Sequence, residues 1–503
     1  MTHKFRYGRL MAGIALASII GLTSQAAHAQ ITIQSNPVFS TPTPGNQPLG
    51  PKPKPFEGKV VKFDPSISAD ETESIDSQDS KEVELGEVTF DGNKYHRDFT
   101  INQYLKPITK KEGKTLDLGI LEKEVKRINA QNGFKLQGTV TKNEETNAAD
   151  VHFDVYEQQP WQVSLTTDNQ GSPGVGTYRG AVQVVRENLL GIGDKMTMQY
   201  LGASRTQRAV ATYAFPVNRW GGKVSFKYAF HRLNYDLMLP TPAQPRTIGR
   251  DNVWVLSVEQ PIGKKREWTP FFSTLWRHVT IDRNGTRVVK ADPRPVAFGV
   301  KFKKKDKYGS TFVKAASIVG SDWSGGDSRF WRAKVVGKRV FNLPKKNKLV
   351  IRGIFQQSPD AMPPVQDITL GGAYSVRGFT ERLIVADRGH QLNVEHYWPV
   401  PFLGKISPKL KDRVKGVTFF DFGQGWIDNS NGRFAGSNSG RTLLASVGGG
   451  LRFNLSRFMQ GFVDFGIPLA NRNNLEFGGQ PNVRVHFGLR SNLLPKPFKK
   501  RDK

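Results

Sequence analysis

The sequence contains no cysteine among its 503 residues, which excludes a disulfide framework, a cysteine-ligated zinc site and a cysteine nucleophile. Outside its N-terminus it also lacks any uninterrupted apolar run of about 18 residues, so a protein made of membrane-spanning helices is excluded. Membrane strands remain open, because each strand needs only about ten alternating residues. Aromatic residues form 11% of the chain and 50 residues are glycine, and this composition excludes intrinsic disorder of the chain as a whole.

Known catalytic signatures are absent as well. The nine histidines form no H-E-x-x-H pattern, and neither a G-x-S-x-G nor a Walker A stretch occurs. We interpret His390 and His396 as ordinary loop or strand residues. The sequence therefore predicts no catalytic residue, no metal site and no cofactor, and we expect that the protein is not an enzyme.

The first residues resemble an export signal in their composition. Three basic residues precede an apolar stretch from 10 to 22, and Ala27-His28-Ala29 forms an A-x-A cleavage site. We therefore predict a signal peptide over residues 1–29, which sends the mature chain out of the cytoplasm.

Residues 30–80 are predicted to be a linker rather than a packed domain. Seven prolines between positions 37 and 55 favour an extended polyproline II chain. The second half turns acidic from Asp64 to Asp79. We interpret this half as a solvated tether, and the alternative is a short acidic helix over Ala69–Gln78 that enters a basic cavity.

The formal net charge of +29 belongs to the part of the chain after residue 160, since the first 160 residues are close to neutral. Nucleic acid is the usual partner of so basic a protein. Export and the lack of a nucleic-acid module argue against it, so no nucleic-acid partner is predicted. A basic membrane surface or a basic channel lining explains the charge instead.

A small α/β domain is predicted over residues 81–158. Alternating apolar residues indicate a strand that ends in the turn Asp91-Gly92-Asn93, and a short helix follows over Phe99–Leu105. Asp117 is a suitable N-cap for a second helix, which Asn132-Gly133 would end. Two further strands complete a β-α-α-β-β order.

Residues 160–494 alternate apolar and polar positions in short runs with very little helix. After an export signal, this pattern predicts a closed transmembrane antiparallel β-barrel, because only closure satisfies every backbone group in hydrocarbon. At about 20 residues per strand with its turn, the region holds about 16 strands. Apolar residues then face lipid and basic residues face a wet lumen. The predicted lumen cations are Lys223, Lys227, Lys301, Lys303, Arg484 and Arg490.

Two lysine clusters and the basic tail carry further charge. We favour solvated turns for Lys301–Lys307 and Lys345–Lys348, and the alternative is contact with anionic lipid headgroups or lipopolysaccharide phosphates. In the tail, residues 495–503, Phe498 takes the place of a terminal aromatic residue of the barrel or the tail trails into the periplasm.

Particular stretches resemble the Omp85 superfamily, and within it the outer-membrane transporters of two-partner secretion. Leu370–Phe379 resembles the family's L-G-G-x-x-x-V-R-G-[FY] loop, and Phe419–Gly423 resembles its F-x-D-x-G strand motif. Residues 168–194 are similar to its first barrel hairpin. Phe90, Gly92 and Asn93 open what is similar to a POTRA domain.

The resemblance implies a loop that folds back into the lumen and is held there by a latch. The loop motif is Val376, Arg377, Gly378 and Phe379, and the wall motif is Phe419, Asp421 and Gly423. Strand alternation points Asp421 inward, where a bidentate bond from Arg377 suits a carboxylate better than lysine would. Gly378 allows a tight turn with positive φ. Because the lumen is wet, we expect the pair to border water.

The resemblance implies a pore in the bacterial outer membrane with its POTRA domain in the periplasm. That domain would capture an unfolded exported protein, typically a β-helical exoprotein, and the barrel would secrete it. Outer-membrane lipid and lipopolysaccharide would surround the barrel. The chain departs from the pattern in having room for one POTRA rather than two. The alternative functions are an insertase that assembles other barrels and a passive porin.

Overall fold

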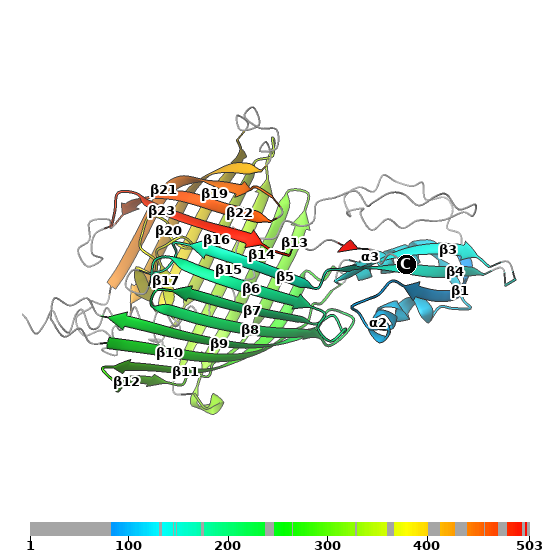
Figure 1. Ribbon diagram of the computed structural model, residues 1–503, viewed down its shortest axis with the longest axis horizontal. Coiled ribbons are helices and arrows are strands. Elements are labelled where there is room, and N and C mark those ends of the chain that lie inside the picture. The colour runs from blue at the N-terminus through cyan, green and yellow to red at the C-terminus, as the bar shows by residue number, and fades with distance from the viewer. Residues whose placement is uncertain are drawn as a thin grey trace, which may run out of the picture.

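The structure is a computed structural model with two parts, a small α/β domain and a large barrel (Figure 1). It describes residues 82–499 apart from 130–132, 144, 147, 173–175, 237–245, 264, 327–328, 360–366, 401–412, 428–439, 457, 471–479 and 495–497. The predicted signal peptide and linker lie outside the described residues.

The small domain has two helices packed on one face of a sheet. Its elements are β1 (Glu82–Asp91), α2 (Asp98–Thr109), β2 (Thr115–Asp117), α3 (Leu118–Asn129), β3 (Phe134–Lys142) and β4 (Ala149–Gln158). β1 pairs with β4 in parallel, and β3 pairs with β4 on its other side in antiparallel. Apolar residues of both helices and the sheet form one core, with Ile101, Leu105, Leu121, Val125, Phe134 and Phe153 almost fully buried.

The predicted β-α-α-β-β order holds with one addition and one extension. The three residues of β2 pair with the start of β1, a strand too short for sequence alternation to reveal. α2 runs past Pro107 to Thr109, whereas we expected it to end at Leu105. The extension buries Ile108, and that burial outweighs the cost of proline near the end of a helix.

The barrel is closed by antiparallel strands. They are β5 (Trp161–Asp168), β6 (Arg179–Glu187), β7 (Lys195–Ala203), β8 (Thr206–Pro216), β9 (Lys223–Asp236), β10 (Arg246–Glu259), β11 (Trp268–Arg283), β12 (Thr286–Ala291), β13 (Val296–Asp306), β14 (Gly309–Gly320), β15 (Phe330–Asn342), β16 (Lys348–Gln357), β19 (Arg388–Pro399), β20 (Val414–Ile427), β21 (Gly440–Asn454), β22 (Met459–Ala470) and β23 (Arg484–Asn492). β12 and β13 together face β11, so the wall has 16 strands, and β23 pairs with β5 to close the ring.

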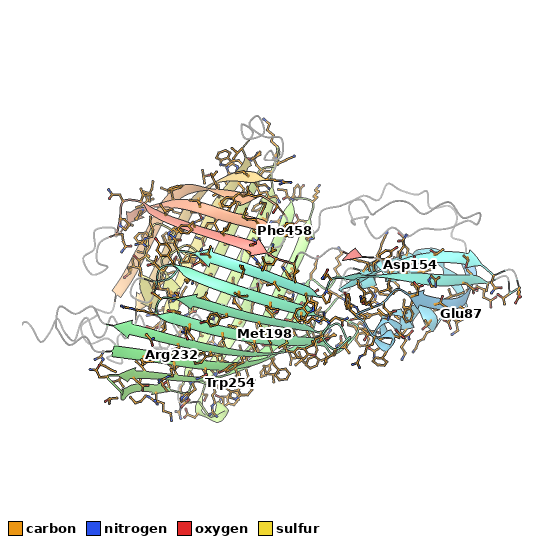
Figure 2. All side chains as sticks on the ribbon, viewed as in Figure 1. Glu87, Asp154, Met198, Arg232, Trp254 and Phe458 are labelled. Atoms are coloured by element: carbon orange, nitrogen blue, oxygen red, sulfur yellow. The ribbon has the colours of Figure 1, made fainter. Side chains whose placement is uncertain are left out.

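Large apolar side chains cover the outside of the wall. Met198 and Trp254 lie on the outer surface (Figure 2), and each is 47% exposed. Phe298, Phe420 and Val485 are exposed in the same way, whereas their strand neighbours face inward. An exposed apolar surface of this extent fits lipid rather than water. No helix in the described part of the chain is long and apolar enough to cross a membrane.

The small domain joins the barrel at the rim where β5 begins (Figure 1). A second connection comes from the C-terminal tail, where β24 (Phe498–Lys499) pairs with Gln158 and Glu157 of β4. The sequence predicts either a tail that trails into the periplasm or a tail whose Phe498 takes the place of the terminal aromatic residue of the barrel. Backbone pairing with the small domain differs from both.

Candidate functional site

The connection between β16 and β19 folds against the inner wall of the barrel. Its described part contains a two-stranded hairpin of β17 (Ile368–Leu370) and β18 (Ile384–Ala386), and the residues between them form the loop tip. Seven buried apolar residues hold this lumen loop to the wall: Ile368, Leu370, Val376, Phe379, Ile384, Ala386 and Leu444 of β21. The predicted loop motif is therefore part of a small apolar core inside the barrel.

Arg377 of the lumen loop and Asp421 of β20 come together as the resemblance implied. Arg377 Nε donates to Asp421 Oδ2 at 2.7 Å, and Nη2 donates to Oδ1 at 2.8 Å. The backbone N–H of Arg377 also donates to Oδ2 at 3.1 Å. Asn393 Nδ2 adds a further bond to Asp421 Oδ1 at 2.7 Å. This bidentate geometry is the strongest form of an arginine–carboxylate contact.

Arg377 has more partners than the sequence indicated. Its Nη1 lies 2.8 Å from Glu395 Oε1 and 3.2 Å from Asp464 Oδ2, and its guanidinium carbon lies 3.5 Å from the centre of the Phe419 ring. One guanidinium thus faces three carboxylates and an aromatic ring. Two neighbouring arginines share the negative charge, since Arg352 pairs with Glu395 and Arg452 with Asp464.

The expectation that the latch borders water is wrong. Asp421 is 0% exposed and Arg377 is 2% exposed. Protein therefore encloses both side chains and shields the pair from the lumen water. A buried ion pair of this kind costs much more to break from one side than a surface pair.

Asp464 belongs to a second copy of the wall motif that the sequence analysis missed. Phe462-Val463-Asp464-Phe465-Gly466 on β22 repeats the F-x-D-x-G pattern of β20. The second copy binds an arginine as the first copy binds Arg377. Arg452 lies over the Phe462 ring at 5.2 Å and donates to Asp464 at 2.8 Å. A search for repeats of the first motif could have found it.

The glycines of the two wall motifs make room for the lumen loop. A Cβ atom at Gly423 would lie 2.9 Å from Val376 Cγ2, and one at Gly466 would lie 2.4 Å from the backbone N of Gly378. Gly378 itself has φ +90, a conformation that favours glycine. The loop and the wall can approach this closely only where these side chains are missing.

Polar bonds from β23 and the preceding turn fix the end of the loop tip. His486 Nε2 accepts from the Gly378 N–H at 3.2 Å, and Gln480 Oε1 accepts from the Thr380 N–H at 2.9 Å. Arg484 donates to Thr380 Oγ1 at 2.8 Å. These partners lie about a hundred residues from the loop in sequence, so no local pattern points to them.

The predicted lumen cations lie on the inner face, but they do not form one group. Lys227 is 4% exposed among inward residues of β9, Arg484 contacts the lumen loop, and Arg490 donates to Ser164 Oγ at 3.1 Å. Lys301 pairs with Glu259. By strand alternation, Lys223 shares the inward face of Lys227 and Lys303 shares that of Lys301.

The predicted POTRA motif shapes a turn that contacts the barrel rim. Gly92 has φ +88 and lies close to β4, Phe90 packs on the domain core, and Asn93 Nδ2 donates to Asp98 Oδ1 at 2.7 Å. Directly after this turn, the Arg97 N–H and Thr100 Oγ1 donate to the Gly191 carbonyl at 3.0 and 2.8 Å. Gly191 belongs to the predicted barrel-entry stretch.

Glu157 of β4 holds this turn in place and was missed in the sequence. Its carboxylate accepts the backbone N–H groups of Lys94, Tyr95 and His96 and contacts His96 Nδ1 at 2.6 Å. Burial alone would raise the pKa of Glu157, but the His96 side chain and the three backbone donors outweigh it and hold the pKa below its usual value.

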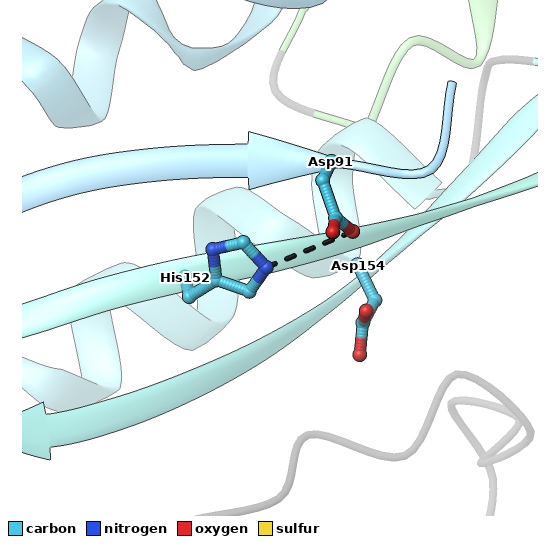
Figure 3. A group of neighbouring side chains, drawn as sticks. All are labelled: Asp91, His152 and Asp154. Atoms are coloured by element: carbon cyan, nitrogen blue, oxygen red, sulfur yellow. Dashed lines mark ion pairs between the residues drawn. The ribbon is translucent and has the colours of Figure 1, made fainter. Parts of the chain in front are cut away.

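The structure also groups Asp91, His152 and Asp154 on the sheet of the small domain (Figure 3). One ligand atom from each lies within 4.8 Å of the others, although no metal ligand was predicted. His152 Nε2 lies 3.7 Å from Asp91 Oδ1, and His152 Nδ1 bonds to Thr89 Oγ1 at 2.9 Å. All three side chains are at least partly exposed, and an ion pair on a sheet surface accounts for the arrangement.

Two protein-family models match the chain. Residues 297–490, which include the lumen loop and both wall motifs, match the Omp85 superfamily domain. Residues 147–241 match the haemolysin secretion/activation protein ShlB/FhaC/HecB. No curated protein matches the chain.

Solved structures of similar fold include CdiB from Escherichia coli, with 16% identity, a TM-score of 0.64 and coverage of 82% of this chain and 77% of that one. CdiB from Acinetobacter baumannii has 16% identity, a TM-score of 0.65 and coverage of 82% and 74%. BamA from Haemophilus ducreyi lacking POTRA domains 1–3 has 13% identity, a TM-score of 0.60 and coverage of 82% and 85%. At such identities the likeness concerns the fold alone.

Proposed function

Since this chain belongs to the Omp85 superfamily and resembles its two-partner secretion branch, we propose that it is an outer-membrane pore that secretes one unfolded partner protein. The match of residues 147–241 to the haemolysin secretion/activation family carries the proposal, because that family consists of secretion transporters rather than enzymes. The Omp85 barrel belongs in the outer membrane, and the small domain lies in the periplasm.

The small domain captures the partner by adding a strand to its sheet. β3 pairs with β4 on one side and forms an edge of the described sheet. An extended chain can pair with such an edge through backbone hydrogen bonds, which demand little of its sequence. An exoprotein that is still unfolded presents extended segments of this kind, and a β-helical partner would fold only after release.

The lumen loop is the movable part of the pore. Its apolar core and the Arg377 latch keep it against β20, β22 and β23, where it takes up lumen space. Arg377, Gly378 and Asp421 hold the loop in its docked position, and they take no part in chemistry.

Deletion of residues 82–156 tests the capture step. The deletion variant should fail to export the partner, while its barrel still reaches the outer membrane and keeps the gel mobility shift of a folded barrel on heating. Normal export by a strain carrying only this variant would exclude capture by the small domain.

The basic turns would meet phospholipid under this orientation. Lys304, Lys305 and Lys307 flank the β13–β14 turn, and Lys345 and Lys346 lie in the β15–β16 turn, both on the rim that carries the small domain. If that rim faces the periplasm, the turns face anionic headgroups of the inner leaflet, and lipopolysaccharide lies at the other rim.

The alternative function, an insertase for other barrels, is favoured by one feature. The closing seam between β23 and β5 has five register pairs, whereas β5–β6 and β22–β23 each have eight. A short seam opens more easily, and an opening could release a substrate strand into the membrane. A cysteine pair that cross-links Arg490 and Thr166 positions should block an insertase and leave secretion through the lumen intact.

A further inference from the structure

One side of the lumen carries a row of cations, which we call the lysine stripe: Lys301 and Lys303 of β13, Lys314 of β14, and Arg332, Lys334 and Lys338 of β15. These residues face inward. Lys301 and Lys314 lie over the buried Phe271 ring at 5.6 and 4.4 Å. Lys334 is 7% exposed, whereas its neighbours Trp331 and Val335 on the lipid side are 43% and 38% exposed.

The stripe follows the height of the wall. In the strand registers Lys301 lies opposite Lys314, and Lys303 and Lys338 both lie opposite Phe312. Lys314 lies opposite Val336, which is two residues from Lys334 on the same strand. The seven residues from Arg332 to Lys338 span about 20 Å of extended strand. The cations therefore line a path from near one rim far into the lumen.

Most of this charge has no acidic partner. Glu259 pairs with Lys301, and among the described residues no carboxylate lies within ion-pair distance of Lys303, Lys314, Lys334 or Lys338. The adjoining wall from β16 onward differs. Arg352 of β16, which is in register with Lys338, contacts Glu395, and Arg377 and Arg452 contact carboxylates of β20 and β22. The latch and the apolar core of the lumen loop also contact this part of the wall, from β19 to β23. Lys303, Lys314 and Lys338 thus present charge to the lumen, whereas Arg332 and Lys334 extend the same face but are buried.

We propose that the lysine stripe is a track for acidic stretches of the exported polypeptide, an inference that rests on the proposed secretion function. An extended chain rises by the same distance per residue as the strands of the wall, so its alternate carboxylates would meet alternate cations. Low-dielectric walls focus the field of the stripe on the lumen. Lysine offers flexible point charges without the fixed geometry of arginine, which suits contacts that form and break as a chain slides.

The test is equilibrium binding of fluorescent poly-glutamate to the purified full-length protein in detergent. A peptide of about 20 residues is long enough, when extended, to overlap the whole stripe. We expect binding that weakens with salt, and no binding of poly-lysine. Each screened ion pair contributes a factor of roughly 1.5 to 5, so Lys303→Gln/Lys314→Gln/Lys338→Gln should weaken binding about tenfold. The control Lys345→Gln/Lys346→Gln/Lys348→Gln removes the same charge at the rim and should bind as the parent does.

Three results would overturn the proposal. These are absence of binding, equal affinity of the stripe variant and the parent, and equal losses in the stripe and rim variants. A fourth is binding that emerges only after deletion of residues 64–79, because the occupant would then be the chain's own acidic segment. The assay measures no export, so its failure leaves the deletion test of secretion unaffected.

Discussion

Replacing Arg377 with alanine should release the lumen loop from the wall while the barrel stays folded. The substitution leaves Asp421 buried with only Asn393 as a side-chain partner, although Arg352 and Arg452 still neutralise Glu395 and Asp464. Breaking a buried pair from one side costs about 3–5 kcal/mol, and the two remaining arginines place this case at the lower end. About 3 kcal/mol corresponds to a roughly hundredfold rise in the population of the released loop.

The absence of cysteine makes this release measurable. A Ser375→Cys substitution places a single thiol in the loop at a position that is 7% exposed, and serine and cysteine are close in size. A water-soluble maleimide should label this thiol slowly while the loop is docked. In the Arg377→Ala background the labelling rate should rise about a hundredfold, because the rate follows the fraction of molecules with the loop released.

Arg277→Ala is the matched control. Arg277 donates two bonds to Asp251 at 2.7 Å, and both side chains are 0% exposed, but the pair joins β10 and β11 and is not part of the latch. This variant loses the same kind of contact and should label at the parent rate. Two results would refute the reasoning that the latch holds the loop. One is a labelling rate of Arg377→Ala within about threefold of the parent rate, and the other is an equal increase in Arg277→Ala.

Three further predictions concern neighbouring groups. Asp421→Ala should raise labelling less than Arg377→Ala, because Arg377 keeps Glu395 and Asp464, and the double variant should match Arg377→Ala; additive effects would show that the two residues act separately. Gly378→Ala should also release the loop, because φ is +90 and a Cβ would lie 3.0 Å from the Gly466 carbonyl carbon. The cost of the docked conformation should rise by about 1–3 kcal/mol. Gly337→Ala is the control and should not change the labelling rate, because no atom lies within 4 Å of a Cβ at that position. Because the pKa of Glu157 is lowered on folding, its stabilisation of the small domain is present above the unfolded pKa of about 4.3 and is lost as pH falls through the lower folded value. Hydrogen exchange of residues 98–109, corrected for intrinsic rates, should therefore be faster in Glu157→Gln than in the parent at pH 6 and similar in both well below the folded pKa; an equal difference at every pH would contradict this assignment.

Local patterns in the sequence determined much of the architecture. Alternation of apolar and charged residues, as around Val224–Phe230, assigns the two faces of a strand, and strand length assigns the approximate number of strands. Both properties depend on residues close together in the chain, so long-range contacts in the folded protein have little effect on them. The helix after Asp117 and the positive φ of Gly378 follow from short-range chemistry in the same way.

The completed site depended on contacts that no local pattern records. Arg377 meets Glu395, Asp421 and Asp464, which come from three different strands and lie up to 87 residues away. A repeat of F-x-D-x-G was visible in the sequence, but its meaning was not. β20 and β22 are separated only by β21, and the lumen loop must fold against this wall before Arg377 meets both copies.

Burial of the latch was decided by tertiary structure alone. The sequence placed Arg377 beside Asp421 through a family resemblance, and a wet lumen made water the expected neighbour. In the folded chain Val376, Phe379 and Leu444 pack the lumen loop on the wall, and the pair is buried. Alternation can tell that a side chain points inward, but whether that interior is water or protein depends on which distant segment fills it, and that is settled by long-range packing.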